Sequence, residues 1–593
     1  MKNKICRSGY GKLSYLSRIF VTGVLSCLVS ISANAANEKA PILNFNDRIF
    51  PEIATKGMVA TQEARATEVG VSILRQGGNA VDAAVAVGFA LAVTLPRAGN
   101  LGGGGFMMIY DKQSGKVRSL DYREKAPKAA YSQMFLDKSL DVDKNKARYS
   151  VFSAGVPGTV AGMLEAHRKY GKLPLKTLIE PAVKLAQNLP MSFAMAESLN
   201  RKKRYLSRSK ESIRNYYKAD GSEWTIYDTL KQENLARVLQ AIADTNGESF
   251  YHGDTAEKLV RFIQSKGGLM TLEDFKSYQP VWREPLSANF GDATIYSMPP
   301  PSSGGIHLVQ LLNIIQEFPI KKAGPNSEYS VHMMTEAMKF AYADRSKYLG
   351  DPDFVTIPVE KLTSTDYAKK IASKISIDKV LKSKDVLPGM YISQESPQTT
   401  HYSVVDKDGN MVSNTYTLNF SFGSGITVPE TGILLNNEMD DFSAKPGVPN
   451  GYGLLGGEAN SIQPEKRPLS SMTPVLVLDK GNPWLATGSP GGSRIITIVY
   501  NVLMNRMVHD MNIASATLAP RIHHQWYPEL LMLEKGFPVD TAERLKEKGH
   551  NIRFFNSWGS VQSVEVGNGV FFGFADTRRP GAKAKGINKI DKE

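Results

Sequence analysis

The most informative segment of the chain is Thr399-Thr400-His401-Tyr402-Ser403-Val404-Val405-Asp406-Lys407-Asp408-Gly409-Asn410. It predicts a strand that turns at Asp408-Gly409 into a second strand, 411–418. A Thr hydroxyl is a poor nucleophile without an adjacent base, and one such base is the residue's own α-amine, which exists only after the preceding peptide bond is cut. Thr399 is therefore a candidate nucleophile, although a Thr at the start of a strand is also a common β-former.

The segment before this strand, 378–398, is polar and poorly periodic. These properties predict an exposed loop that is suited to a cut. Cleavage after Gln398 would divide the chain into two parts and give Thr399 its free amine.

The first 35 residues have the pattern of a cleaved signal peptide. A basic start is followed by the apolar run 19–33 and by the small-x-small sequence Ala33-Asn34-Ala35. The apolar run is shorter than the about 20 residues that a membrane span needs. Both cysteines, Cys6 and Cys27, lie in this segment. We therefore expect a periplasmic mature protein with no disulfide and no cysteine ligand.

The remaining chain shows interleaved helical and strand periodicity, without a Pro/Ser-rich linker, which favours one large α/β body over separate modules. The formal net charge of +14 for the whole chain stays positive after the basic segment is removed. Helices are expected at 61–76, from Asn79 to before Pro96, and at 308–315, 333–348, 361–377 and 493–503. Strands are expected at 106–110, 401–405, 411–418, 473–478, 484–487, 561–566 and 570–574.

Three further segments carry residues suited to chemistry. Gly488-Ser489-Pro490-Gly491-Gly492-Ser493-Arg494 lies between a strand and a helix, where backbone N–H groups suit an oxyanion hole; an ordinary Gly-rich turn is the alternative. Ser470-Ser471 precedes a strand and suits either a carboxylate site or a turn. The acidic segment 436–442 suits an ammonium site, a Ca²⁺ site or a solvated turn, but it lacks the Ca²⁺-loop spacing.

Taken together and in order, these motifs resemble the γ-glutamyltranspeptidase (glutathione hydrolase) family of N-terminal-nucleophile hydrolases. The resemblance spans nearly the whole mature chain. Its motifs are 399–405, Tyr416-Thr417-Leu418-Asn419, 422–425, 436–442, 467–472, 488–494, Asn100-Leu101-Gly102-Gly103-Gly104, Asp121-Tyr122-Arg123-Glu124 and 301–305. Each motif alone is weak, and the ordered set makes the resemblance specific.

The resemblance implies an α/β (α+β) fold, a stacked αββα sandwich, made of a large subunit, 36–398, and a small subunit, 399–593. Thr399 would attack the carbonyl carbon of Gln398 and later serve as nucleophile. Thr417 would orient Thr399. The N–H groups of Gly491 and Gly492 would form the oxyanion hole.

The resemblance also implies a site for a γ-glutamyl donor such as glutathione. Arg123, Ser470 and Ser471 would hold the α-carboxylate of the donor. Its α-ammonium group would lie against Asn419, Glu438 and Asp441. The Gly- and Pro-rich segment 446–457 would form a lid with Tyr452 at its tip. Water, amino acids or dipeptides would be acceptors, and neither a cofactor nor a metal is expected.

Two rival functions remain at this point. One is a β-lactam (glutaryl or cephalosporin) acylase on the same scaffold, and the other is a non-enzymatic periplasmic binding protein. Other signals are weak: Arg201-Lys202-Lys203-Arg204 is typical of a solvated helix face, and neither this run nor the signal peptide favours a nucleic-acid partner. The adjacent pair His523-His524 lacks a recognisable third metal ligand.

Overall fold

The structure is a computed structural model that describes residues 48–386, 399–451 and 453–589. The described residues form one compact unit. The predicted signal peptide, Gln398 and Tyr452 lie outside the described residues. Among the described helices, none is both long enough and apolar enough to cross a membrane.

One seven-stranded sheet contains the two strands on either side of the Asp408-Gly409 turn at its centre. The order is β19-β2-β10-β11-β3-β4-β7, and all neighbours are antiparallel. The bounds are β19 (Lys583–Gly586), β2 (Gly57–Thr61), β10 (Thr400–Asp406), β11 (Met411–Thr417), β3 (Gly104–Asp111), β4 (Lys116–Tyr122) and β7 (Val281–Arg283). The predicted hairpin is confirmed, with Thr400 paired to Tyr416.

A second seven-stranded sheet stacks on the first, in the order β1-β18-β17-β13-β12-β9-β8. Its strands are β1 (Glu52–Ala54), β18 (Val570–Ala575), β17 (Gln562–Gly567), β13 (Asn482–Thr487), β12 (Val475–Asp479), β9 (Ala293–Ser297) and β8 (Leu286–Phe290). Hydrogen bonds join the facing sides of the sheets. The Ser413 hydroxyl donates to the Thr487 carbonyl at 3.0 Å, and the Ser403 hydroxyl donates to the Gln562 carbonyl at 3.0 Å.

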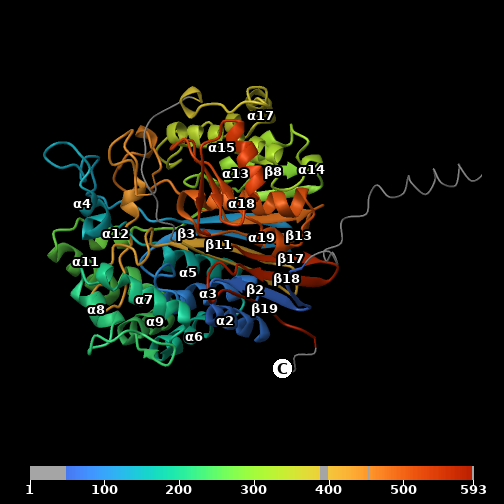
Figure 1. Ribbon diagram of the computed structural model, residues 1–593. Helices are drawn as coiled ribbons and strands as arrows, with labels where there is room; N and C mark the ends of the chain where they lie inside the picture. The colour runs from blue at the N-terminus through green and yellow to red at the C-terminus, as the bar shows by residue number, and fades with distance from the viewer. Residues whose placement is uncertain (1–47, 387–398, 452, 590–593) are drawn as a thin grey trace, which may run out of the picture. The chain divides into compact units, whose positions relative to one another are not determined.

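Helices cover the outer face of each sheet, so the predicted αββα sandwich is confirmed (Figure 1). The first sheet carries α2 (Ala64–Arg75), α3 (Ala80–Thr94) and α5 (Thr159–Tyr170), with α6 (Leu175–Gln187) and α9 (Glu233–Asp244) packed outside them. The second sheet carries α13 (Gly304–Ile315) and α19 (Ile513–Leu518), and α15 (Glu328–Tyr348) and α18 (Ile495–Leu503) pack against α13.

Local sequence explains where these helices begin. The side chain of Asn79 accepts from the backbone N–H groups of Val81 and Asp82, and Asp82 completes a capping box, so α3 begins there. Every residue of α3 is buried, as its apolar composition predicts. The helix predicted at 61–76 begins later, at Ala64, because Thr61 belongs to β2 and Glu63 is the N-cap.

One predicted helix is in fact two shorter helices. Residues 361–377 do not form a single helix, because α16 (Val359–Thr363) ends at Ser364 and α17 (Thr365–Ala372) begins there. The Ser364 hydroxyl accepts from the Tyr367 N–H group, which satisfies a donor at the new helix start. Ser364, which lies inside the predicted helix, is the N-cap of α17.

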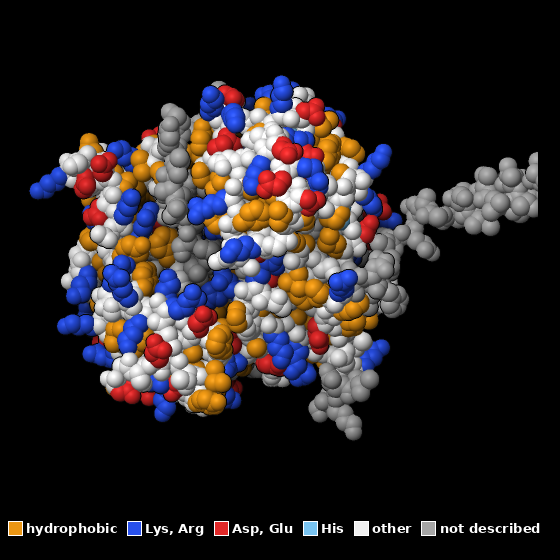
Figure 2. All heavy atoms as spheres, viewed as in Figure 1, with side chains coloured by type: hydrophobic (Ala, Val, Ile, Leu, Met, Phe, Trp, Pro, Cys, Tyr) orange, Lys and Arg blue, Asp and Glu red, His pale blue; other side chains and the backbone are white. Residues whose placement is uncertain are grey.

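The basic run at 201–204 lies on α7 (Phe193–Leu206), as a partly exposed helix face. Arg201 pairs with Glu197 one turn earlier on this helix at 3.1 Å. Figure 2 shows Lys and Arg side chains spread over the visible face with Asp and Glu among them. The basic run thus forms a solvated helix face, as predicted.

Candidate active site

Thr399 lies immediately before β10. This strand and its neighbour β11 lie at the centre of the first sheet. Thr399 is buried, and its hydroxyl donates to the Thr417 hydroxyl at 3.3 Å. Thr417 ends β11 and also accepts from the Asn419 N–H group at 2.8 Å. The antiparallel pairing of β10 and β11 therefore brings together the two threonines that the sequence predicted as neighbours.

The threonines open into a small cavity of about 20 Å³, which is room for about one water molecule. Its lining residues come from both sides of the predicted cleavage position. They are Arg123, Arg345, Thr399, Thr417, Asn419, Glu438, Asp441, Leu454, Ser470, Ser471, Met472, Gly492, Ser493 and Ile495.

The largest charge cluster in the cavity surrounds Arg123, which follows the end of β4 and is buried. Its guanidinium lies 2.6 Å from Glu438, 2.5 Å from Asp441 and 3.3 Å from Glu124. Burial opposes the charge of Arg123, but the three carboxylates together raise its pKa above the ordinary value. The sequence assigned Arg123 and the pair Glu438/Asp441 to opposite ends of a donor, whereas the structure places them in direct contact.

The buried carboxyl groups of Glu438 and Glu124 resist ionisation. Burial raises the pKa of Glu438 well above its usual value, and Glu124 and Asp441 raise it further against the opposing effect of Arg123. Burial also raises the pKa of Glu124 to about 7. Three carboxyl groups around one guanidinium offer acceptor oxygens to a further donor such as an ammonium group.

Ser470 and Ser471 are held at the cavity by the turn that precedes α13. Ser470 donates its N–H group to the Pro301 carbonyl at 2.8 Å, and the Ser303 N–H group donates to the Ser470 carbonyl at 2.8 Å. The Pro301-Ser302-Ser303-Gly304-Gly305 motif therefore acts as a support for the serine pair. The sequence indicated both motifs but not their contact.

The turn Gly488–Arg494 carries two consecutive glycines with positive φ, Gly491 at 153° and Gly492 at 59°. The second is in the left-handed region that favours glycine. At Gly491 a Cβ atom would lie 2.8 Å from Ile498 Cδ1. Gly492 lines the cavity, and α18 begins directly after this turn. The predicted strand–turn–helix order is present, and its N–H groups lie at a helix N-terminus.

Arg345 is a cavity residue that sequence reasoning missed. It lies in the last turn of α15 and donates to the Ser471 hydroxyl at 3.2 Å and to the Ser303 hydroxyl at 3.1 Å. Burial lowers its pKa to about 10, which leaves it cationic at neutral pH. Only the tertiary packing of α15 against α13 reveals this second cation, since no local motif marks it.

The segment predicted to be a lid is anchored to the acidic cluster. Asp440 accepts from the Gly451 N–H group at 2.8 Å and from the Arg148 guanidinium at 2.9 Å. Leu454 of the same segment lines the cavity. Asp440 thus ties residues 446–457 to the wall of the site, another role that the sequence did not indicate.

Asp440 should give the folded protein a measurable pH dependence. Burial raises its pKa to about 7, against the opposing effect of Arg148, from a usual value of 3.8. Because the folded-state pKa is raised, its stabilising contribution is complete below about pH 4 and is lost as the pH rises to about 7. We expect Asp440→Asn to flatten the decline in Tm between pH 4 and 7.

Thermal unfolding across that pH range checks this expectation. Asp292→Asn is a matched control, because Asp292 is an exposed carboxylate paired with Lys480 at 3.2 Å. Its curve should run parallel to that of the wild type. Superimposable curves for wild type and Asp440→Asn would show that Asp440 does not titrate as the structure indicates.

The sequence profile described as Gamma-glutamyltranspeptidase matches residues 66–586. The chain belongs to this family. The chain is 49% identical to the glutathione hydrolase proenzyme of Escherichia coli strain K12, over 96% of this chain and 98% of that protein. It is 37% identical to the glutathione hydrolase proenzyme of Bacillus subtilis strain 168, over 96% of this chain and 98% of that protein.

A solved structure shows how widely the scaffold of this family member is shared. A cephalosporin acylase from Bacillus halodurans superposes with a TM-score of 0.81 and 28% identity, over 92% of this chain and 98% of that chain. This likeness confirms the fold. It does not by itself distinguish a γ-glutamyl enzyme from an acylase, since both share the scaffold. Those relatives, named glutathione hydrolases, favour the γ-glutamyl assignment over the acylase and over a binding protein without activity. The protein is an enzyme.

Proposed function

We propose that this protein hydrolyses and transfers γ-glutamyl groups from glutathione and related donors, after it has cut itself between Gln398 and Thr399. The observation that carries the proposal is the placement of Thr399 and Thr417 in one cavity with the Arg123 charge cluster. The names of the relatives, glutathione hydrolase proenzymes, support both the donor and the precursor state.

Self-cleavage is proposed to begin with attack of the Thr399 hydroxyl oxygen on the carbonyl carbon of Gln398. The C–N bond then breaks, the amide nitrogen takes up the proton, and the acyl chain is left as an ester on Thr399. Water hydrolyses that ester. The products are a large subunit, 36–398, and a small subunit, 399–593, which stay associated as a heterodimer through the shared sandwich.

In the mature enzyme, the freed α-amine of Thr399 takes the proton of its hydroxyl as the oxygen attacks the γ-carbonyl carbon of the donor. The N–H groups of Gly491 and Gly492 stabilise the developing oxyanion. The leaving amine departs with a proton, and a γ-glutamyl ester of Thr399 remains. Water completes hydrolysis, while the amine of an amino acid or dipeptide completes transfer.

Recognition of the donor rests on its zwitterionic end. Its α-carboxylate competes with Asp441 for Arg123 and accepts from Ser470 and Ser471, next to the second cation, Arg345. Its α-ammonium replaces Arg123 as the partner of Glu438 and Asp441, with Asn419 beside them. Such an exchange of ion pairs lets the small cavity open without leaving a buried charge unpaired.

Tyr452 and the segment 446–457 are proposed to close over the bound donor, anchored by Asp440. The mature enzyme is proposed to lie in the periplasm after removal of residues 1–35. It needs neither a cofactor nor a nucleic-acid partner for this chemistry.

A comparison of two chromogenic donors tests the substrate class. We expect hydrolysis of γ-glutamyl-p-nitroanilide to exceed that of glutaryl-p-nitroanilide by about 10² or more in kcat/KM, because the glutaryl group lacks the ammonium that the carboxylates hold. Equal rates, or faster glutaryl hydrolysis, would assign the enzyme to the acylases. Cleaved protein that turns over neither donor would contradict both assignments.

A further inference from the structure

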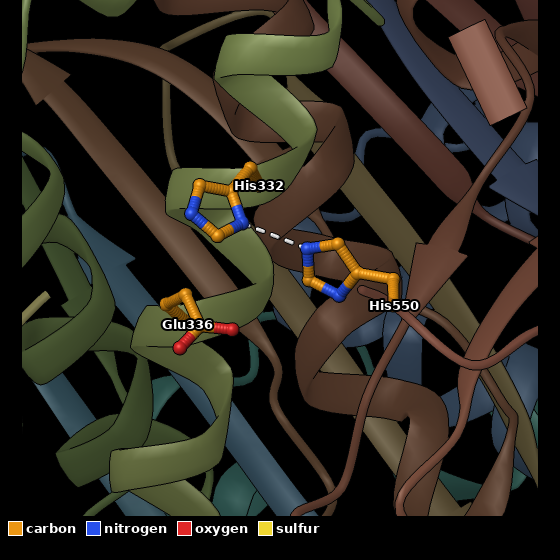
Figure 3. Close-up of side chains that lie close together, drawn as sticks. All are labelled: His332, Glu336 and His550. Atoms are coloured by element: carbon orange, nitrogen blue, oxygen red, sulfur yellow. Dashed lines mark hydrogen bonds between the residues drawn. The ribbon is translucent and has the colours of Figure 1, made fainter. Parts of the chain in front are cut away.

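A second cluster of functional side chains lies away from the cavity, between α15 and the loop that follows α20 (Val539–Glu547) (Figure 3). His332 and Glu336 are four residues apart on α15, so they share one helix face. His550 faces them from the loop. One ligand atom of each lies within 4.8 Å of the others, and all three residues are buried.

The hydrogen bonds fix which nitrogen of His332 is available as a ligand. His332 Nε2 lies 2.8 Å from the Ser376 carbonyl oxygen, which can only accept, so Nε2 carries the proton. His332 Nδ1 therefore presents its lone pair to His550 Nε2 at 2.7 Å. A histidine whose second nitrogen donates to a backbone carbonyl is the arrangement that proteins use to orient a metal ligand.

Glu336 is oriented in the same way. One of its oxygens accepts from the Leu381 N–H group at 3.0 Å, and the other lies 2.9 Å from Lys339 Nζ. Lys339 also lies 3.2 Å from Glu529. Two carboxylates thus surround one ammonium and leave an excess of one negative charge, which favours the binding of a cation.

We propose that His332, Glu336 and His550 bind a divalent transition-metal ion, for which Zn²⁺ has the best match. Two imidazole nitrogens and one carboxylate form a common Zn²⁺ ligand set, with water in the fourth position. The proton on His550 Nε2 moves to Nδ1 of the same ring, so the exchange balances. With Zn–N distances of about 2.0–2.1 Å in a tetrahedral site, the two nitrogens must separate by less than about 1 Å.

The ligands come from both sides of Thr399, since His332 and Glu336 precede it and His550 follows it. If the proposed self-cleavage occurs, the ion would connect the two subunits. The contacts with Ser376 and Leu381 also anchor the chain that leads toward the cut. The sequence did not predict this site, because more than two hundred positions separate His332 from His550.

Metal titration of the full-length protein, without a histidine tag and stripped with a chelator, tests the site. We expect one Zn²⁺ per molecule by mass spectrometry of bound metal, and one Co²⁺ with the visible absorption of tetrahedral coordination. His550→Gln and Glu336→Gln should each weaken binding by at least about 10-fold. His509→Gln, a histidine outside the cluster, should bind as the wild type does.

Binding that is absent in the wild type, or unchanged in both ligand variants, overturns the proposal. Two variants are used so that a folding failure in one leaves the other informative. The same titration on uncleaved Thr399→Ala separates the site from the proposed function, because the site does not require cleavage. Zn²⁺ should also raise the urea concentration at which the cleaved subunits separate, and no change would overturn the connecting role.

Discussion

The Thr399→Ala variant should remain a single chain with activity reduced by more than about 10³-fold. Removing the hydroxyl deletes the atom that attacks the carbonyl of Gln398 and also the nucleophile of the mature enzyme. Gel electrophoresis under denaturing conditions follows the cleavage, and release of p-nitroaniline from the γ-glutamyl anilide follows the activity. Chain cleavage and p-nitroaniline release should both be lost.

Thr400→Ala is the matched control for this variant. Thr400 is also a buried threonine, one position along, and among the described residues its hydroxyl has no hydrogen-bond partner. Its loss should leave cleavage intact. Thr399→Ser, which keeps a hydroxyl, should still cleave. Two chains from Thr399→Ala would assign the nucleophile to another residue.

Arg123→Lys should lower kcat/KM for the γ-glutamyl anilide by about 10² or more, mainly through KM. Lysine keeps the charge but replaces a planar fork with a single point charge. It cannot reproduce the contacts of Arg123 with Glu438 and Asp441 in the free enzyme, or with the donor carboxylate in the proposed complex. Each lost charge-assisted hydrogen bond is worth about 1.5–3 kcal/mol. Steady-state kinetics on the cleaved protein measures the effect.

Arg118→Lys provides the control, because Arg118 lies on β4, the strand that ends just before Arg123, and pairs with the exposed Glu284 at 2.7 Å. An exposed ion pair contributes about 0–1 kcal/mol, so kinetics and stability should hardly change. A wild-type KM in the Arg123→Lys enzyme would contradict the proposal that Arg123 binds the donor. Arg123→Met is less informative, since it leaves the carboxyl groups of Glu124, Glu438 and Asp441 without their cation, and the first two are buried. The loss should destabilise the fold by about 3–5 kcal/mol.

The sequence predicted the parts of the site that rest on local patterns. The strand that begins after Thr399 and the Asp408-Gly409 turn are encoded within a short window, and the turn brings Thr417 back beside Thr399. The Gly491-Gly492 turn before α18 is equally local. These features follow from strand alternation and turn chemistry, which one sequence contains.

Features that depend on packing between distant segments were not predictable in this way. Arg345 reaches Ser471 because α15 packs on α13, and no residue near it in the sequence marks the contact. The ion pairs of Arg123 with Glu438 and Asp441 join residues more than three hundred positions apart. The family resemblance implied roles for Glu438 and Asp441, but their contact with Arg123 is visible only in the fold.

The intact mass and N-terminal sequence of the purified wild-type protein test directly whether self-cleavage releases Thr399. We expect two chains, the smaller beginning Thr399-Thr400-His401-Tyr402 and ending at Glu593. One uncut chain in an active preparation, or a cut at another bond, would contradict the assignment of Thr399 as the self-generated nucleophile.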